Sequence, residues 1–133
     1  MKRIFIAIFF ILLSILIGIY SLVETEQICN KMIIEVEYAI KENKEVTESN
    51  SHQKRVDFYE TTTEIKSLWE KNSKFFYIFF NNDDIKTIET NIEKLPEHAK
   101  SGDLESTNLC LVESLEELEY LKNNSKLTFS NIF

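Results

Sequence analysis

Residues that interrupt helices are scarce in this chain, which has two glycines and one proline among its 133 residues. Glycine and proline are unfavourable inside helices and are strong markers of turns, so their scarcity predicts long helices joined by few turns. Charged residues make up 28% of the chain, which is typical of helices with solvated faces. We therefore expect an all-α fold.

Histidine and cysteine are equally scarce, with two of each. His52 and His98 have no histidine partner four residues away and no cysteine nearby, whereas a metal site needs three or four converging ligands. We interpret both as surface histidines. We expect no metal ion and no cofactor.

Catalytic motifs are also missing. The glutamates between residues 113 and 119 lack an accompanying nucleophile or oxyanion donor, so we interpret them as a solvated helix face. Asp83 and Asp84 lack the alternating acids, the glycine and the distal glutamate of a calcium loop, and helix capping explains them better. We predict that the protein is not an enzyme.

One apolar run organises the rest of the chain. Residues 4–23 carry no charge, and at about 1.5 Å per helical residue they span roughly 30 Å, the thickness of a bilayer's hydrocarbon core. Lys2 and Arg3 precede the run and acidic residues follow it. The positive-inside rule then predicts a single-pass protein of the cell membrane, with a cytoplasmic end (1–3), a transmembrane helix (4–23) and an extracytoplasmic domain (24–133).

A cleaved signal peptide is the alternative interpretation of this run. The run is long for that role and no A-x-A-like site follows it, although cleavage at Tyr20-Ser21 is tolerable. An uncleaved anchor is favoured. Tyr20 would then lie in the aromatic belt on the outer side.

Acidic residues are confined to the predicted exported part. All 22 lie at or after Glu24, together with 13 of the 15 basic residues, so this part carries a net charge of −9. Such a surface repels nucleic acid, and we exclude a nucleic-acid partner.

Helical spacing continues beyond the apolar run. Apolar residues recur at three- and four-residue steps to about Glu45 without an intervening glycine or proline, which predicts one continuous helix rising about 30 Å above the bilayer. Polar residues 44–51 predict a turn, and a second helix is expected to start near Ser51.

The second helix contains residues 75–80, the most apolar stretch outside the anchor. A single helix over residues 51–99 would be about 75 Å long and would drive charged side chains into lipid, so we predict a break near Asn82. The stretch then lies close to the outer membrane surface. We expect it to form bundle core or, alternatively, to contact the membrane interface or a membrane partner. The candidate interaction residues are Phe75, Phe76, Phe79 and Phe80.

Two further helices complete the predicted bundle. Pro96 is expected to kink or end the third helix, with a turn at residues 101–102. Asp103 then caps a fourth helix that ends at residues 123–125, and alternating residues 127–133 predict an extended tail. The predicted fold is an N-terminal transmembrane helix that continues into an exported antiparallel bundle of about four helices with a short extended C-terminal tail.

The two cysteines would both lie outside the membrane, where disulfides persist. An intrachain bond requires Cα atoms within about 7 Å, and the heights of Cys29 and Cys110 in an up-down bundle need not match. We favour two free, half-buried thiols over an intrachain or an intermolecular bond.

Several patterns resemble a known family. They are Trp69, the run Phe79-Phe80-Asn81-Asn82-Asp83-Asp84-Ile85, the helix over residues 103–121, and the terminal segment with Asn131-Ile132. The family is catalogued as domain of unknown function 4363 and comprises small single-span proteins of Gram-positive, largely spore-forming bacteria. The resemblance, which covers about residues 51–133, supports the architecture and implies no activity. It suggests four structural-motif residues, Trp69, Asn82, Asp83 and Asn131, although the family commonly has a histidine where Asn82 stands.

Two functions are consistent with an anchored domain that lacks catalytic motifs. The first is an accessory or interaction subunit of another membrane protein. The alternative is a sensor-like bundle that binds a ligand between its helices. Residues 1–3 are too short to form an output domain, so we favour the first and do not expect a small-molecule ligand.

Overall fold

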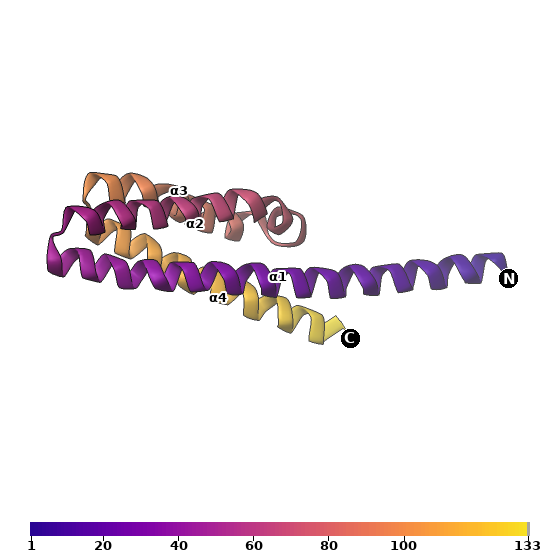
Figure 1. Ribbon diagram of the computed structural model, residues 1–133. Coiled ribbons are helices and arrows are strands. Elements are labelled where there is room, and N and C mark those ends of the chain that lie inside the picture. The colour runs from indigo at the N-terminus through magenta and orange to yellow at the C-terminus, as the bar shows by residue number, and fades with distance from the viewer. Residues whose placement is uncertain (133) are drawn as a thin grey trace.

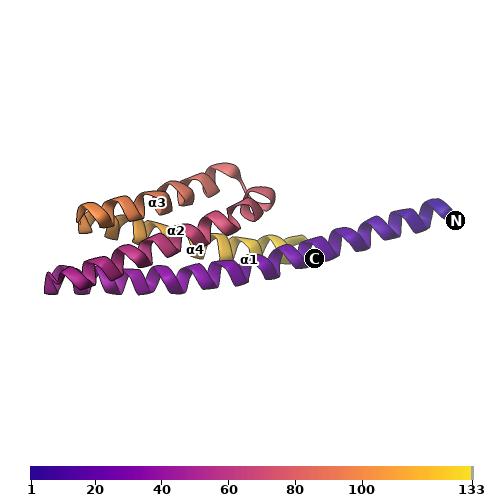
Figure 2. The ribbon, with the colours of Figure 1, turned by 45° about the horizontal axis from the view of Figure 1, so that its top comes forward.

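The computed structural model describes residues 1–132, and side chains up to Leu127. Four helices follow one another: α1 (Lys2–Ser49), α2 (His52–Phe79), α3 (Asn82–Ser101) and α4 (Leu104–Ile132). α1 and α3 each pack against α2 and α4, which gives an antiparallel four-helix bundle. Figures 1 and 2 show that the first half of α1 projects from this bundle. The predicted all-α bundle is confirmed.

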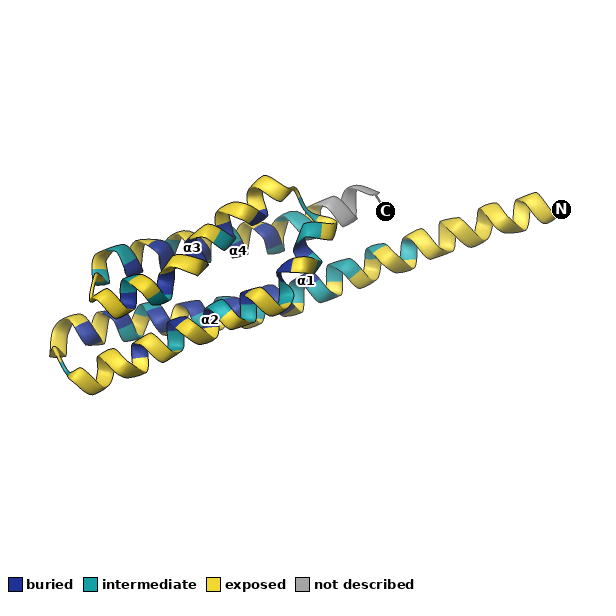
Figure 3. Cartoon of the chain, turned by 90° about the horizontal axis from the view of Figure 1, so that it is seen from above, coloured by how far each residue is buried: buried dark blue, intermediate teal, exposed yellow. Residues whose placement is uncertain are grey.

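α1 is one helix from the apolar run into the bundle, as predicted. Among the described residues it is the one helix long and apolar enough to cross a membrane, which fits a single-pass anchor by length and composition. Residues 1–14 are all in the exposed class, and the first buried residue is Thr25 (Figure 3). The helix ends at Asn50, which adopts the left-handed conformation (φ 45°) and donates its backbone N–H to the Val46 carbonyl. The turn is therefore shorter than the predicted residues 44–51.

The predicted break near Asn82 is confirmed. α2 ends at Phe79, and the side chain of Asn81 caps α3 by accepting the backbone N–H of Asp83 at 2.9 Å. Asp83 and Asp84 occupy the first turn of α3, where carboxylates interact favourably with the helix dipole.

α3 continues through Pro96 to Ser101, so of the two predicted alternatives, a kink or an end at this proline, the end is wrong. Proline removes one intrahelical hydrogen bond, but Leu95 and Ala99 on either side of it are buried in the core. Their packing holds the chain in helical conformation. Gly102, with φ 78°, provides the predicted turn.

α4 begins as predicted, because the Asp103 carboxylate accepts the backbone N–H of Ser106 at 3.0 Å. Its end differs from the prediction. The helix passes through residues 123–125 and reaches Ile132, so the extended tail is wrong for residues 127–132; Phe133 lies outside the described residues. Asparagine and serine lower helix propensity only modestly. The ammonium of Lys126, 2.9 Å from the Glu26 carboxylate, ties this part of α4 to α1.

One apolar core fills the bundle. The buried faces of all four helices turn inward (Figure 3), and the largest fully buried side chains are Trp69, Phe58, Phe76 and Met32. The core begins well inside α1, so it leaves the first turns of that helix without a protein partner.

Candidate functional site

The two ends of the bundle differ, and we name them by position. The near end adjoins the projecting half of α1 and contains the α2–α3 turn. The far end contains the α1–α2 and α3–α4 turns (Figure 1).

A chain of aromatic rings closes the near end. Trp69 stacks on Phe76 with ring centroids 5.6 Å apart, Phe76 contacts Phe75 edge-on at 5.7 Å, and Phe75 contacts Tyr20 edge-on at 6.3 Å. Tyr20 belongs to the apolar run, so these contacts link that run to the bundle core. The position of Phe75 agrees with the helix-length argument that placed residues 75–80 near the outer end of the run.

The four candidate phenylalanines do not share one environment. Phe76 is 0% exposed and belongs to the core, so its assignment as an interface residue was wrong. Phe75 and Phe80 pack partly buried against the core, and Phe79 is 37% exposed. Ile78, which the sequence analysis missed, is 74% exposed because it lies on the opposite side of α2 from Phe76. The helical position relative to Trp69 and Phe76 would have identified it.

The four structural-motif residues are dispersed. Trp69 is fully buried, and its indole N–H has no hydrogen-bond partner within the described part of the chain. Asn82 is exposed in the first turn of α3, whereas Asp83 donates its backbone N–H to the cap. Asn131 belongs to α4, and its side chain lies outside those described. The first three contribute to core packing and to the turn rather than to a shared site.

A seam between α1 and α4 extends the near end towards the projecting half of α1. Within the apolar run, partial burial first appears at Ile15, Gly18, Ser21 and Leu22. Ile15, Gly18 and Leu22 fall on one helical stripe with Glu26, whose carboxylate pairs with Lys126 of α4. The Lys126 ammonium lowers the pKa of Glu26. α4 therefore faces the outer third of the run.

The side of α1 that lies opposite its buried residues is uncovered. Ile34 is 63% exposed and Tyr38 53% exposed, although both are large apolar side chains within the bundle half of the helix. They lie on the same side of α1 as the exposed Leu16 and Val23, at spacings close to whole helical turns. We call these four residues the outer face of α1. The exposed Gln27 lies on the same side between Val23 and Ile34, so the face consists of one apolar pair in the run and one in the bundle.

Polar groups border the far end. An open groove of about 700 Å³ lies between α1 and α4, and its rim includes Lys41, Lys44 and Glu105. At its base the buried Asn43 donates from Nδ2 to the Leu104 carbonyl at 3.1 Å, and its Oδ1 has no hydrogen-bond partner among the described residues. The groove is wide and rimmed by charge of both signs.

Cys29 and Cys110 are free thiols, and both are buried rather than half-buried. In the antiparallel register that Glu26 and Lys126 define, they lie roughly 15–20 Å apart along the bundle, too far for a disulfide. Burial raises the pKa of Cys29 to about 12 and also raises that of Cys110. Both thiols are therefore poor nucleophiles at neutral pH.

Two carboxylates lie between neighbouring helices, and one of them, Glu117, departs from the solvated-face interpretation of the glutamates between residues 113 and 119. Glu89 accepts a 2.6 Å hydrogen bond from the Tyr77 hydroxyl, which raises the pKa of Tyr77 to about 12. Glu117 is half-buried against α3, where burial and the nearby Glu113 carboxylate raise its pKa. In the described part of the chain, no three or more of the His, Cys, Asp and Glu side chains gather in a group that could hold a metal ion.

The comparisons with known proteins identify a family and nothing further. No curated protein and no solved structure matches the chain. One family matches residues 17–132, from the middle of the apolar run to the end of α4, and it therefore includes the seam between α1 and α4. The chain belongs to the family described as a domain of unknown function (DUF4363).

Proposed function

We propose that the protein is a non-enzymatic, membrane-anchored accessory subunit that binds another membrane protein through the outer face of α1. In this proposal residues 4–23 span the cell membrane with the N-terminus in the cytoplasm, and the bundle is extracytoplasmic. The lysine and arginine before the run and the acidic residues after it support this orientation.

The observation that carries the proposal is the uncovered outer face of α1. Ile34 and Tyr38 lie one turn apart on the exposed side of α1, in line with Leu16 and Val23 of the apolar run. A partner with its own transmembrane helix would contact this line both within the bilayer and above it. Full burial of a large apolar side chain contributes about 1.5–3 kcal/mol, and because Ile34 and Tyr38 are 63% and 53% exposed, each would contribute about 1–2 kcal/mol on binding.

The junction between the two halves of α1 supports the same role. The helix is unbroken, and contact of Tyr20 with Phe75 and of Glu26 with Lys126 fixes the bundle at its base. A partner bound to the apolar run would therefore meet the bundle in one defined orientation.

Site-specific photo-cross-linking in cells that produce the full chain tests the proposal. A photoreactive amino acid at Ile34 or Tyr38 should give one adduct of the same mass, larger than the chain by the mass of another membrane protein. The matched control is Glu60, an exposed residue of α2 that faces away from the core and should give none. Absence of adducts at both positions, equal adducts at Glu60, or an adduct of twice the chain mass would each contradict the proposal.

A further inference from the structure

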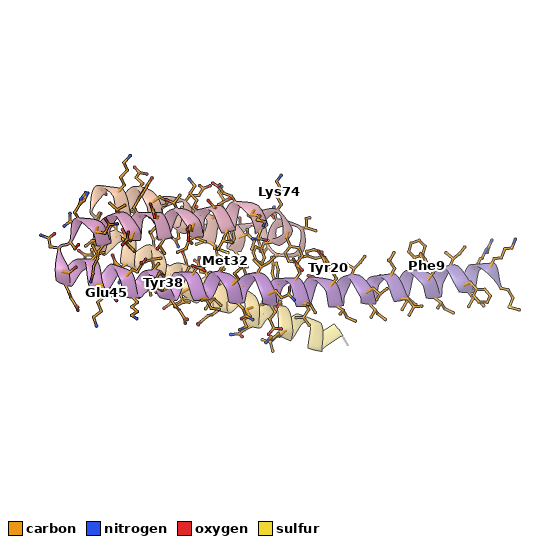
Figure 4. All side chains as sticks on the ribbon, in the orientation of Figure 1. Phe9, Tyr20, Met32, Tyr38, Glu45 and Lys74 are labelled. Atoms are coloured by element: carbon orange, nitrogen blue, oxygen red, sulfur yellow. The ribbon has the colours of Figure 1, made fainter. Side chains whose placement is uncertain are left out.

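The register of α4 against α1 determines how far its last turns reach. Asn43 lies beside Leu104 at the far end, and Glu26 beside Lys126 at the near end. Residues 127–132 continue α4 by about 9 Å beyond this pair, towards the N-terminus of α1. Figure 4 shows the end of α4 level with Tyr20 along the length of α1.

The burial of α1 gives an independent measure of this overlap. Residues 1–14 are exposed on all sides, and Phe9 projects with no other helix beside it (Figure 4). Partial burial appears at Gly18 and Leu22, on the same stripe of α1 as Glu26, the partner of Lys126. The end of α4 and the outer third of the apolar run are therefore at the same level.

The length of the uncovered helix is too short for a bilayer. The pairing of Glu26 with Lys126 places the end of α4 at the level of about residue 20, so the turns over residues 2–19 that lie beyond it span roughly 27 Å, whereas a hydrocarbon core is about 30 Å thick. A bilayer crossed by α1 must therefore extend to the part of the helix that α4 covers. The end of α4 then lies at the depth of the membrane interface.

The chemistry of this end fits that depth. Residues 127–133 carry no charged side chain, whereas Lys122 and Lys126 immediately precede them. Leu127 is 61% exposed, and it lies on the same face of α4 as the exposed Leu109 because 18 residues make five helical turns. Amphipathic helices place such apolar side chains about 5–10 Å into the boundary between head groups and acyl chains.

We propose that residues 127–132 of α4 are a second lipid-contacting element, which lies in the outer membrane interface beside α1. This inference rests on the membrane anchoring in the proposed function but not on a protein partner. The near end of the bundle is thereby seated in the interface rather than held above it. Ile78, exposed at the same end, faces the lipid head groups or the water just above them.

Spin labels on the full chain in liposomes test the inference. Leu127→Cys, Leu109→Cys and Phe9→Cys are each labelled in a Cys29→Ala/Cys110→Ala background, and collisions with lipid-soluble oxygen and a water-soluble nickel chelate are measured. The oxygen-to-nickel ratio should be several times higher at Leu127 than at Leu109, which has the same exposure and helix face. Phe9 reports on the anchor itself and should give a high ratio.

The outcomes separate the inference from the proposed function. A low ratio at Leu127 with a high ratio at Phe9 would overturn the inference and leave the anchor intact. A low ratio at Phe9 would instead reject the anchor. Protection of Leu127 from both reagents would indicate contact with protein and would also overturn the inference.

A second measurement tests the inference if the Cys29→Ala/Cys110→Ala variant folds poorly. Leu127→Trp and Leu109→Trp, with both native thiols kept, are compared in liposomes of brominated lipid. Quenching beyond that of the buried Trp69 should occur for Leu127→Trp and not for Leu109→Trp. Equal quenching of the two variants contradicts the inference.

Discussion

The near and far ends of the bundle are closed by different kinds of contact. At the far end Asn43 donates to the Leu104 carbonyl and Lys54 pairs with Glu45 at 3.4 Å, beside a left-handed turn residue, Asn50. At the near end the aromatic chain from Trp69 to Tyr20 provides the closure. Polar contacts suit an end surrounded by water, whereas aromatic contacts suit an end beside apolar surroundings.

The largest expected effect is at the aromatic end. Phe76→Ala removes a fully buried ring stacked on Trp69 and should lower the free energy of unfolding by about 3–5 kcal/mol. The measurement is urea unfolding of the full chain in detergent micelles, followed by far-ultraviolet circular dichroism. Phe79→Ala, which truncates a partly exposed ring one turn away, should cost much less. Equal losses would mean that the aromatic chain does not close the near end.

The polar end should respond less strongly. Asn43→Ala removes the side chain that donates to the Leu104 carbonyl. Because Asn43 is buried, the change should lower the free energy of unfolding by about 1–3 kcal/mol in the same assay. Asn108→Ala, on the exposed rim of the same groove, should change stability by less than about 0.5 kcal/mol. A neutral Asn43→Ala would show that the far end does not depend on this hydrogen bond.

The contact between the apolar run and the bundle should give a smaller, pairwise effect. A double-mutant cycle of Tyr20→Ala and Phe75→Ala should yield a coupling energy of about 0.5–1.5 kcal/mol, typical of an edge-on aromatic pair. Tyr20→Ala combined with Tyr59→Ala at a distant position serves as the control and should show no coupling. Additive effects of Tyr20→Ala and Phe75→Ala would show that the contact between the apolar run and the near end does not contribute to stability.

The smallest expected effect concerns Glu117, a half-buried carboxylate between α3 and α4. Burial raises its folded-state pKa above the ordinary value of about 4.5, so the folded state binds its proton more tightly than the unfolded state. Stability from this group is present below the unfolded pKa and is lost as the pH rises through the folded pKa.

Glu117→Gln should therefore stabilise the protein at neutral pH, by less than about 1 kcal/mol because the group is partly exposed and screened. The gain should vanish as the pH falls below about 4.5. Urea unfolding at several pH values measures it, and Glu116→Gln on the exposed side of α4 is the control. A gain that persists at low pH would assign the effect to packing rather than to charge.

Local chemistry made most helix boundaries predictable. The continuous α1 follows from the absence of a helix breaker in its bundle half, the break at Asn82 from the capping residues, and the start of α4 from Asp103. The errors arose where tertiary contacts outweigh local preference. Pro96 stays within a helix because its neighbours are buried.

The environments of individual side chains were harder to predict. Residues 127–132 remain helical beside α1, although their alternation is typical of an extended segment. Phe76 and Ile78 are two residues apart in an apolar run, and the sign of which is buried, the seven-residue spacing of Phe76 from Trp69, was not used. The outer face of α1 was missed because Ile34 and Tyr38 become distinctive only when the positions of α2 and α4 are known.

The unbroken α1 also makes the bundle a lever arm. The part of the helix beyond residue 23 is about 40 Å long, so if α1 spans a bilayer as proposed, each 10° change in its tilt would move the far end by about 7 Å, mainly parallel to the membrane. Bilayers of different thickness change such tilts. The position of the α1–α2 turn above the membrane surface would then report on the thickness of the bilayer below it.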